Sequence, residues 1–185
     1  MPEQAVRGGV RPELRADCAR CFGLCCVAPA FAVSAEFAIN KPAGQACPNL
    51  RPDFRCGIHR DLRARGFPGC AVYDCFGAGQ HVAQVTFGGR DWRQAPDTAR
   101  QMFDVFAVMR QLHELLWHLT EAVALAPAGP LHAELERMLD RTARLADSTG
   151  AAPSPQESAD GRRAGEKDRG DPEGDATPSP RRRRA

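Results

Sequence analysis

The sequence predicts a mainly α protein, built from a small irregular cysteine-rich α+β module, an antiparallel helical hairpin and a disordered C-terminal tail. All eight cysteines of the 185-residue chain lie between Cys18 and Cys75. Residues 94–147 carry apolar side chains at alternating spacings of three and four, as helices that pack on a neighbour do. Residues 148–185 contain no Val, Ile, Leu, Met, Phe, Trp, Tyr or Cys.

The overall composition is that of an ordinary globular protein. Hydrophobic residues make up 43% of the chain, charged residues 26%, and the formal net charge is +2, so no large field of one sign is expected. No stretch approaches the roughly 18–20 apolar residues of a membrane-spanning helix. The first 17 residues lack the apolar core of a signal peptide. We therefore expect a cytoplasmic protein, in which clustered cysteines more often bind metal or perform redox chemistry than form disulfides.

The first part of the chain is expected to be a flexible arm, residues 1–13, followed by the cysteine-rich module, residues 14–93. Many glycines and prolines interrupt this module, so only short elements fit. Residues 32–39 are long enough for one or two helical turns, and the alternation over residues 82–87 predicts a short strand. The module has few large apolar side chains, and something other than hydrophobic burial must help to hold it together.

A helical hairpin is predicted for residues 94–147. Asp97 is the expected N-cap of its first helix, and Pro130 suits the first turn of the second helix. The short connection between them predicts an antiparallel pair. The apolar faces are a hydrophobic core or a surface that binds a protein partner or a second copy, and the sequence leaves the oligomeric state open. The first face comprises Met102, Val105, Met109, Leu112, Leu116, Leu119 and Val123, and the second comprises Leu131, Leu135, Met138, Thr142 and Leu145.

The tail, residues 148–185, has no large apolar side chain to offset the entropy of ordering, which predicts disorder. It ends in four arginines, Arg181 to Arg184, but its eight basic and seven acidic residues nearly cancel. A nucleic-acid tether is therefore not favoured, and a solvated tail is the simpler interpretation.

The cysteines form a pattern that is typical of a metal site. The C-x2-C-x3-C-C head is followed by four further cysteines, and the C-x2-C spacing lets two thiolates on one turn reach one ion. Thiolates suit zinc or iron clusters rather than calcium or magnesium. Eight thiolates would serve two tetrahedral sites, but the adjacent pair leaves the division between ions open. The predicted metal ligands are Cys18, Cys21, Cys25, Cys26, Cys47, Cys56, Cys70 and Cys75, with His59 as a further candidate.

Other interpretations of these residues remain open. One or two cysteines could be buried core residues, and disulfides would form if the protein were exported. Tyr73 and Asp74 lie next to Cys75 and suit either packing or support of a metal site. Six arginines are close enough in sequence to offset thiolate charge: Arg20, Arg51, Arg55, Arg60, Arg63 and Arg65.

Two resemblances rest on these motifs. The order of the C-x2-C-x3-C-C head, "CPNL", "RCGIH" and "GFPGCAVYDCF" resembles the CxxCxxCC (YkgJ-type) zinc- or iron-chelating family, although Gly66 to Gly69 replace its usual Arg-Pro. Residues 14–140, with "DCARCFGLCCV", "NKPAG" and "VYDCFGAGQHVAQVTFGGRDWR", resemble the N-terminal region of actinobacterial pentapeptide-repeat proteins. The pentapeptide repeats themselves are absent here, so no activity of those repeats is carried over.

Three functions follow as hypotheses. The first is a cysteine-rich, metal-binding module, with zinc as the cofactor, that serves a structural or interaction role. The alternatives are an iron–sulfur protein with a redox or sensing role and a thiol-based redox switch. We find no hydrolase triad, phosphate-binding loop or paired carboxylates, so the sequence offers no catalytic residues and no support for an enzyme.

Overall fold

A computed structural model describes residues 12–149, and these residues are mainly helical, as predicted. The predictions for the flexible arm and the disordered tail lie almost wholly outside this range. The elements are η1 (Pro12–Leu14), α1 (Leu24–Val27), η2 (His59–Asp61), α2 (Pro68–Val72), α3 (Ala78–Gln80), η3 (His81–Thr86), α4 (Ala99–Leu125) and α5 (Pro130–Thr149).

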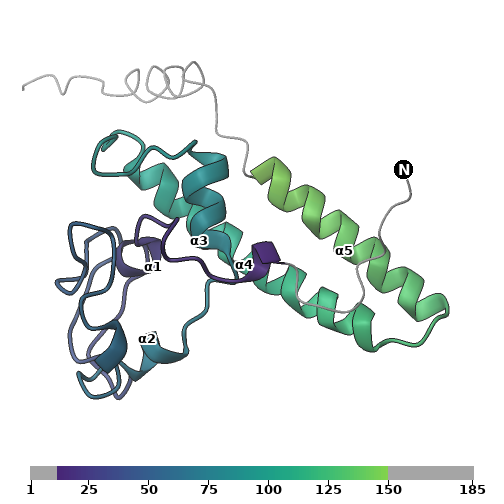
Figure 1. The fold of residues 1–185 in the computed structure, drawn as a ribbon, viewed down its shortest axis with the longest axis horizontal. Helices are drawn as coiled ribbons and strands as arrows, with labels where there is room; N and C mark the ends of the chain where they lie inside the picture. The colour runs from purple at the N-terminus through teal and green to yellow at the C-terminus, as the bar shows by residue number, and fades with distance from the viewer. Residues whose placement is uncertain (1–11, 150–185) are drawn as a thin grey trace, which may run out of the picture. The chain divides into compact units, whose positions relative to one another are not determined.

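Helices α4 and α5 form the predicted antiparallel hairpin and lie side by side (Figure 1). The apolar face of α4 is buried as expected, with Met102 and Met109 completely enclosed. Pro130 begins α5, where its missing N–H costs no hydrogen bond. The predicted N-cap is wrong by one residue: Thr98 precedes α4, and neither it nor Asp97 caps the helix with a side chain.

The predicted buried face of α5 is partly wrong. Leu131, Met138 and Leu145 are exposed, and α5 instead buries Leu139, Thr142 and Ala146. Two overlapping faces satisfy the helical period, one richer in large apolar residues and one carrying smaller residues. The smaller side chains of Thr142 and Ala146 let the two helix backbones approach closely, which explains why that face is turned toward α4.

The core lies where the short elements meet α4. Elements η1, α1, α3 and η3 all contact this helix. Leu14, Leu24 and Val27 come from the start of the chain, and Val82 and Phe87 come from the segment that precedes α4. The cysteine-rich module is therefore anchored to the hairpin by apolar packing at both of its ends.

Two predicted elements of the cysteine-rich module differ in the structure. Residues 82–87 were expected as a strand, but residues 81–86 form a π-helix whose buried side chains, including Val82 and Thr86, face the core. Residues 32–39 form no helix; they are a loop closed by the paired backbone of Phe31 and Lys41. Between residues 12 and 149 there is no strand, only isolated bridges, so the α+β description of the module is wrong for the described residues.

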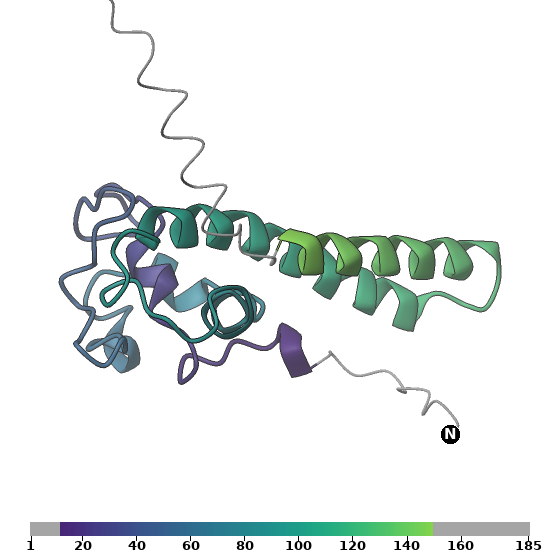
Figure 2. The same cartoon turned by 90° about the horizontal axis from the view of Figure 1, so that it is seen from above.

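Residues 28–77 form loops with very little apolar core of their own. Their buried apolar side chains are Cys47, Leu62 and Phe67. Both views place these loops at the end of α4 opposite the hairpin turn (Figures 1 and 2). The loops therefore receive little support from the long helices, and this region contains four of the eight cysteines.

Among the described residues, no helix has the length and apolar character needed to cross a membrane.

Candidate metal centre

All eight cysteines are reduced and lie in residues 18–75. Helix α1 carries Cys25 and Cys26, helix α2 carries Cys70, and the others lie in loops. Cys47 is buried, whereas Cys18 is exposed and the remaining six are half-buried. This half-buried placement is unlike that of simple core cysteines, which pack as fully enclosed apolar groups.

One group of cysteines surrounds the start of α3. A Cβ atom placed on Gly79 would lie 2.7 Å from Sγ of Cys21 and 3.7 Å from Sγ of Cys75, so both sulfurs face the same glycine. The segment that contains Cys21 is held there by Gln84, whose Nε2 donates a 2.8 Å hydrogen bond to the carbonyl of Arg20. The side chain of Gln80 also bonds to the backbone of Arg15 and Asp17.

Cys18 belongs to the same group. Burial raises the pKa of its thiol, and the neighbouring thiolates of Cys25 and Cys75 raise it further. The guanidinium of Arg55 acts in the opposite direction and lowers the Cys18 pKa. Of the six arginines that the sequence suggested, Arg55 is thus one whose positive charge reaches a thiol.

A second group of cysteines lies where the loop that carries Cys47 meets α1. The backbone N–H of Cys47 donates a 2.9 Å hydrogen bond to the carbonyl of Cys26, and Leu50 pairs with Cys56 in a short antiparallel bridge. Burial raises the pKa of Cys70 to about 11, and the thiolates of Cys25, Cys47 and Cys56 contribute to that rise. Cys47, Cys56 and Cys70 therefore lie within electrostatic range of one another, and Cys25 acts on both Cys56 and Cys70.

The adjacent pair in α1 lies between the two groups. Consecutive side chains on a helix point about 100° apart. Even so, Sγ of Cys25 and Sγ of Cys26 are 4.0 Å from each other, which is a contact and not a disulfide. The hydrogen bond with Cys26 is the largest cause of the raised pKa of Cys25, followed by burial. Two charged thiolates at this distance need a positive partner.

Backbone N–H groups oppose the effect of burial on the pKa of several thiols. Burial raises the pKa of Cys21 to about 12, while N–H groups of Leu24 and Gly23 donate to its sulfur and oppose the rise. The N–H groups of Gly79 and Gly77 donate in the same way to Cys75, as does that of Ile58 to Cys56. Such donors stabilise a thiolate over a neutral thiol. At all three cysteines burial nevertheless outweighs these donors, and the thiol pKa stays above its ordinary value.

Lys41 is a residue beside the cysteines that the sequence did not single out. Its side chain is only 4% exposed, and its Nζ donates to the carbonyls of Val27, Pro42 and Gln45 at 2.9–3.1 Å. Burial lowers its pKa, and the thiolates of Cys47 and Cys26 raise it again. A buried ammonium thus ties the loops together beside the second group of cysteines and supplies positive charge there.

Within residues 12–149, no three Cys, His, Asp or Glu side chains are arranged as a closed metal site. The sulfurs are near one another, but the positions in this structure are those of free thiols. The structure thus brings the predicted cysteine ligands into one region, in two groups. Within the described residues their sulfurs do not converge as tightly as the ligands of a bound metal ion would.

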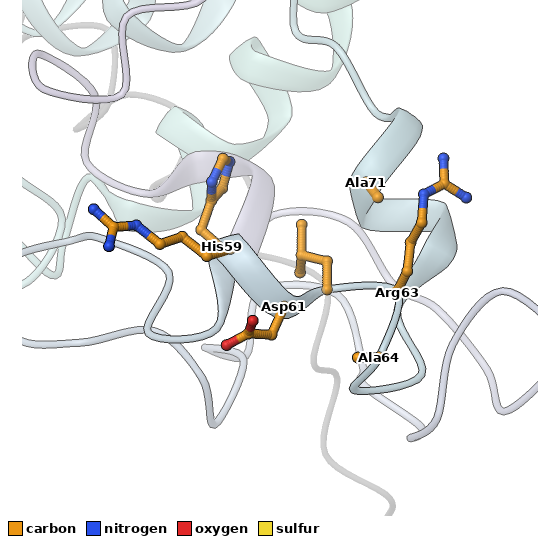
Figure 3. A pocket seen from close by; sticks show the side chains of 7 residues that line it. His59, Asp61, Arg63, Ala64 and Ala71 are labelled. Carbon is orange, nitrogen blue, oxygen red and sulfur yellow. The ribbon is translucent and has the colours of Figure 1, made fainter.

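His59 lines a pocket that contains none of the cysteines (Figure 3). This surface pocket of about 310 Å³ is also lined by Arg60, Asp61, Leu62, Arg63, Ala64 and Ala71. The His59 ring and the Asp61 carboxylate leave the η2 turn in different directions. His59 is exposed, so its position gives no support to a role as a metal ligand.

The residues between Cys70 and Cys75 contact α4. Arg110 lies over the ring of Tyr73 and donates a 3.3 Å hydrogen bond to the carbonyl of Asp74. The carboxylate of Asp74 accepts the N–H of Phe76 at 2.7 Å and so fixes the turn after Cys75. Both residues act on the shape of this turn, and Arg110, whose guanidinium is paired with Glu114 at 2.9 Å, ties the turn to α4.

Comparison with known proteins gives a relative whose name states no activity. The chain is similar to the uncharacterized protein YybG of Bacillus subtilis (strain 168), with 51% identity over 143 residues. The match covers 77% of this chain and 51% of that protein, so the chain spans about half the length of the curated relative it matches. No family model matches the chain, and no solved structure does. Any function must therefore be argued from the cysteines and their surroundings.

Proposed function

We propose that this protein is a zinc-binding module in which the eight cysteine thiolates hold the loops of residues 28–77. The observation that carries the proposal is the gathering of sulfurs: Sγ of Cys21 and Sγ of Cys75 both face Gly79, and Sγ of Cys25 and Sγ of Cys26 are 4.0 Å apart. Cysteine sulfurs gathered in this way are the ligands that structural zinc prefers.

The composition of these loops supports the same proposal. They bury few apolar side chains, so hydrophobic burial supplies little of their stability. Zinc binding to deprotonated cysteines contributes folding free energy directly, because the coordinated state exists only when the chain is folded. Zinc would supply structural cross-links at sites that need no hydrophobic core. Binding would require the thiols of each group to move closer together than they are in the structure.

A redox role is the second candidate, and the contact between Cys25 and Cys26 favours it. Their sulfurs are 4.0 Å apart, so oxidation of the pair would compete with metal binding. In this case hydrogen peroxide takes two electrons from the two thiolates, which join as a disulfide, and with two protons it is reduced to two water molecules while zinc is released. An iron–sulfur cluster remains an alternative cofactor for the same thiolates.

Three further expectations remain proposals of the same account. A cytoplasmic location would keep the thiols reduced. The resemblance to pentapeptide-repeat proteins implies a module that is joined to other domains in some relatives. The hairpin would bind a partner through the apolar residues it leaves exposed on α5, which are Leu131, Met138 and Leu145.

Elemental analysis tests the proposal. The full chain is purified without oxygen and without an affinity tag that binds metal, and its zinc, iron and visible spectrum are measured. We expect a colourless protein that contains zinc and no iron. A brown protein that contains iron and sulfide would show that the cofactor is an iron–sulfur cluster and not zinc. A metal-free protein with eight reactive thiols would overturn the proposal of a metal site altogether.

A further inference from the structure

We propose that two copies of this chain pair through the exposed apolar face of α5, with the two helices antiparallel. That face consists of Leu131, Met138 and Leu145, which are 64%, 41% and 56% exposed. The proposal rests on the part of the proposed function that assigns this face to a partner, and it names the partner as a second copy. It is independent of bound metal, because the face lies on the hairpin and not among the cysteines.

The three side chains, here called the apolar row, follow one another at a spacing of seven residues. Residues seven apart lie two turns apart on one side of a helix. Helix α4 packs along α5 (Figure 1), where α5 buries Leu139 and Thr142, and so it leaves the apolar row exposed. An exposed row of large apolar side chains beside charged ones is typical of a surface that binds another protein.

The apolar row is symmetric about Met138, since Leu131 precedes it by seven residues and Leu145 follows it by seven. If two α5 helices lie antiparallel about a two-fold axis at Met138, Leu131 of each copy is level with Leu145 of the other. The two Met138 side chains then meet at the axis. Both copies use the same surface, so the contact is complete in a dimer. The apolar row thus matches itself.

The charges beside the apolar row favour the antiparallel arrangement. Glu134 lies three residues after Leu131, and Arg141 lies three residues after Met138, so both flank the row on the same side. In the antiparallel pair, Glu134 of each copy is within one residue of the level of Arg141 in the other copy. In a parallel pair, glutamate would instead face glutamate and arginine would face arginine. Opposite charges in these positions select the partner and its direction.

Both flanking side chains are exposed. Arg137 donates to Glu134 through Nε and Nη2, and both hydrogen bonds end on Oε2. Oε1 of Glu134 can therefore accept from Arg141 of a second copy while the bond to Arg137 is kept. Exposed ion pairs and one helix face contribute little free energy, so we expect a weak dimer with a dissociation constant of roughly 0.1 mM. At the few micromolar of a spectroscopic experiment the chain would be monomeric.

Sedimentation equilibrium of the full chain tests the pairing, over concentrations from about 10 to 500 µM. Met138→Glu places two carboxylates at the two-fold axis. Glu134→Arg and Arg141→Glu each make the flank of the apolar row a single sign, and the double variant E134R/R141E restores opposite charges in exchanged positions. The control is Asp140→Arg, a charge reversal at an exposed position about 200° around the helix from Met138. Zinc per chain is measured in the same samples.

We expect the wild type and Asp140→Arg to form dimers of equal affinity and Met138→Glu to stay monomeric. Each single charge reversal should weaken the dimer about tenfold or more, and E134R/R141E should return to within about threefold of the wild type. A monomeric wild type that contains zinc would overturn the pairing alone and leave this face to another protein. A dimer that lacks metal would overturn the zinc proposal alone.

Two further results would also contradict the pairing. A dimer that Met138→Glu leaves intact would show that the contact lies elsewhere on the chain. A double variant no better than the two single ones would overturn the antiparallel arrangement, because exchanged charges must attract in it as the native ones do.

Discussion

The loops of residues 28–77 and the hairpin of α4 and α5 are stabilised in different ways. The hairpin, with the short elements packed on α4, buries a continuous apolar cluster in which Met102 and Met109 are completely enclosed. The loops bury three apolar side chains, one of which is a cysteine, together with one lysine. A chain can therefore fold one region by hydrophobic burial and leave the next to polar contacts and, in our proposal, to metal.

The largest effect is expected in the hairpin. Met109→Ala removes a completely buried side chain and should destabilise the protein by about 2–5 kcal/mol, because a cavity remains at the centre of the helix packing. Urea unfolding monitored by far-ultraviolet circular dichroism measures this free energy.

The matched control is Met138→Ala on α5. Met138 is 41% exposed although its sequence spacing predicted a buried position. We expect a change within about 0.5 kcal/mol, as for other surface substitutions. An equal loss of stability in the two variants would contradict the burial of α4 and the exposure of this face of α5.

A smaller effect is expected in the loops. Lys41→Met removes the ammonium that serves three carbonyls and should cost about 1–3 kcal/mol, because buried acceptors are left without a donor. The loss should also weaken zinc binding by Cys26 and Cys47, the two cysteines whose charges act on Lys41. The measurements are urea unfolding and competition with a zinc chelator.

Arg100→Met is the control for Lys41→Met. The Arg100 side chain is 95% exposed and lies 3.9 Å from Asp104, so its replacement should leave both stability and zinc affinity almost unchanged. If Lys41→Met behaved like Arg100→Met, the buried ammonium would have no role in holding the loops.

The connection between the two regions gives a more modest prediction. Trp92 donates a 2.9 Å hydrogen bond to the carbonyl of Phe22 and packs edge-on against Phe54 and Phe103. Trp92→Phe keeps an aromatic ring but removes the donor, so we expect a loss of about 0.5–1.5 kcal/mol. Trp117→Phe is the comparison, since its ring packs on Phe76, and it should cost less. If urea unfolding showed a larger loss of stability for Trp117→Phe than for Trp92→Phe, the hydrogen bond of Trp92 would not be what connects the two regions.

The smallest effect depends on pH. Burial lowers the pKa of His113, whose Nδ1–H donates a 2.7 Å hydrogen bond to the carbonyl of Phe76. Because the folded pKa lies below the unfolded value, the unfolded chain binds more protons. The stability contributed by neutral His113 is then present above about pH 6.5 and is lost as pH falls through the folded pKa.

His113→Asn keeps an N–H donor but has no group that titrates in this range. Its free energy of unfolding should fall less than that of the wild type between pH 7.5 and 5.5. Both proteins need equal zinc content throughout, because acid also releases zinc from thiolates. Identical pH dependence in the two proteins would contradict the placement of a neutral, buried His113.

The sequence predicted the hairpin well because helical periodicity is a repeated signal. Positions such as Met102, Met109 and Leu116 agree on one face over several turns. In α5 two faces fit the same period, and the choice between them depends on how closely small residues such as Ala146 allow the helices to pack. The segment at residues 82–87 alternates like a strand, but its burial against α4 favours a helix.

Composition predicted that the cysteine-rich segment consists of loops, but it did not predict how those loops are arranged. The motif identified the eight thiols and left their grouping open, because backbone pairing between Cys26 and Cys47 depends on loop closure that no local pattern encodes. Lys41 was missed, although one signal was present: the chain has 23 arginines and only two lysines. A compact ammonium with three donors fits among three carbonyls, which a planar guanidinium does not.

The proposal that zinc replaces a hydrophobic core in the loops is tested most directly by amide hydrogen exchange of the full chain, with zinc bound and after chelation under reducing conditions. Peptides that cover residues 28–77 should lose most of their protection on chelation, while those from α4 and α5 should keep theirs. Unchanged protection of residues 28–77 in the metal-free protein would contradict the proposal.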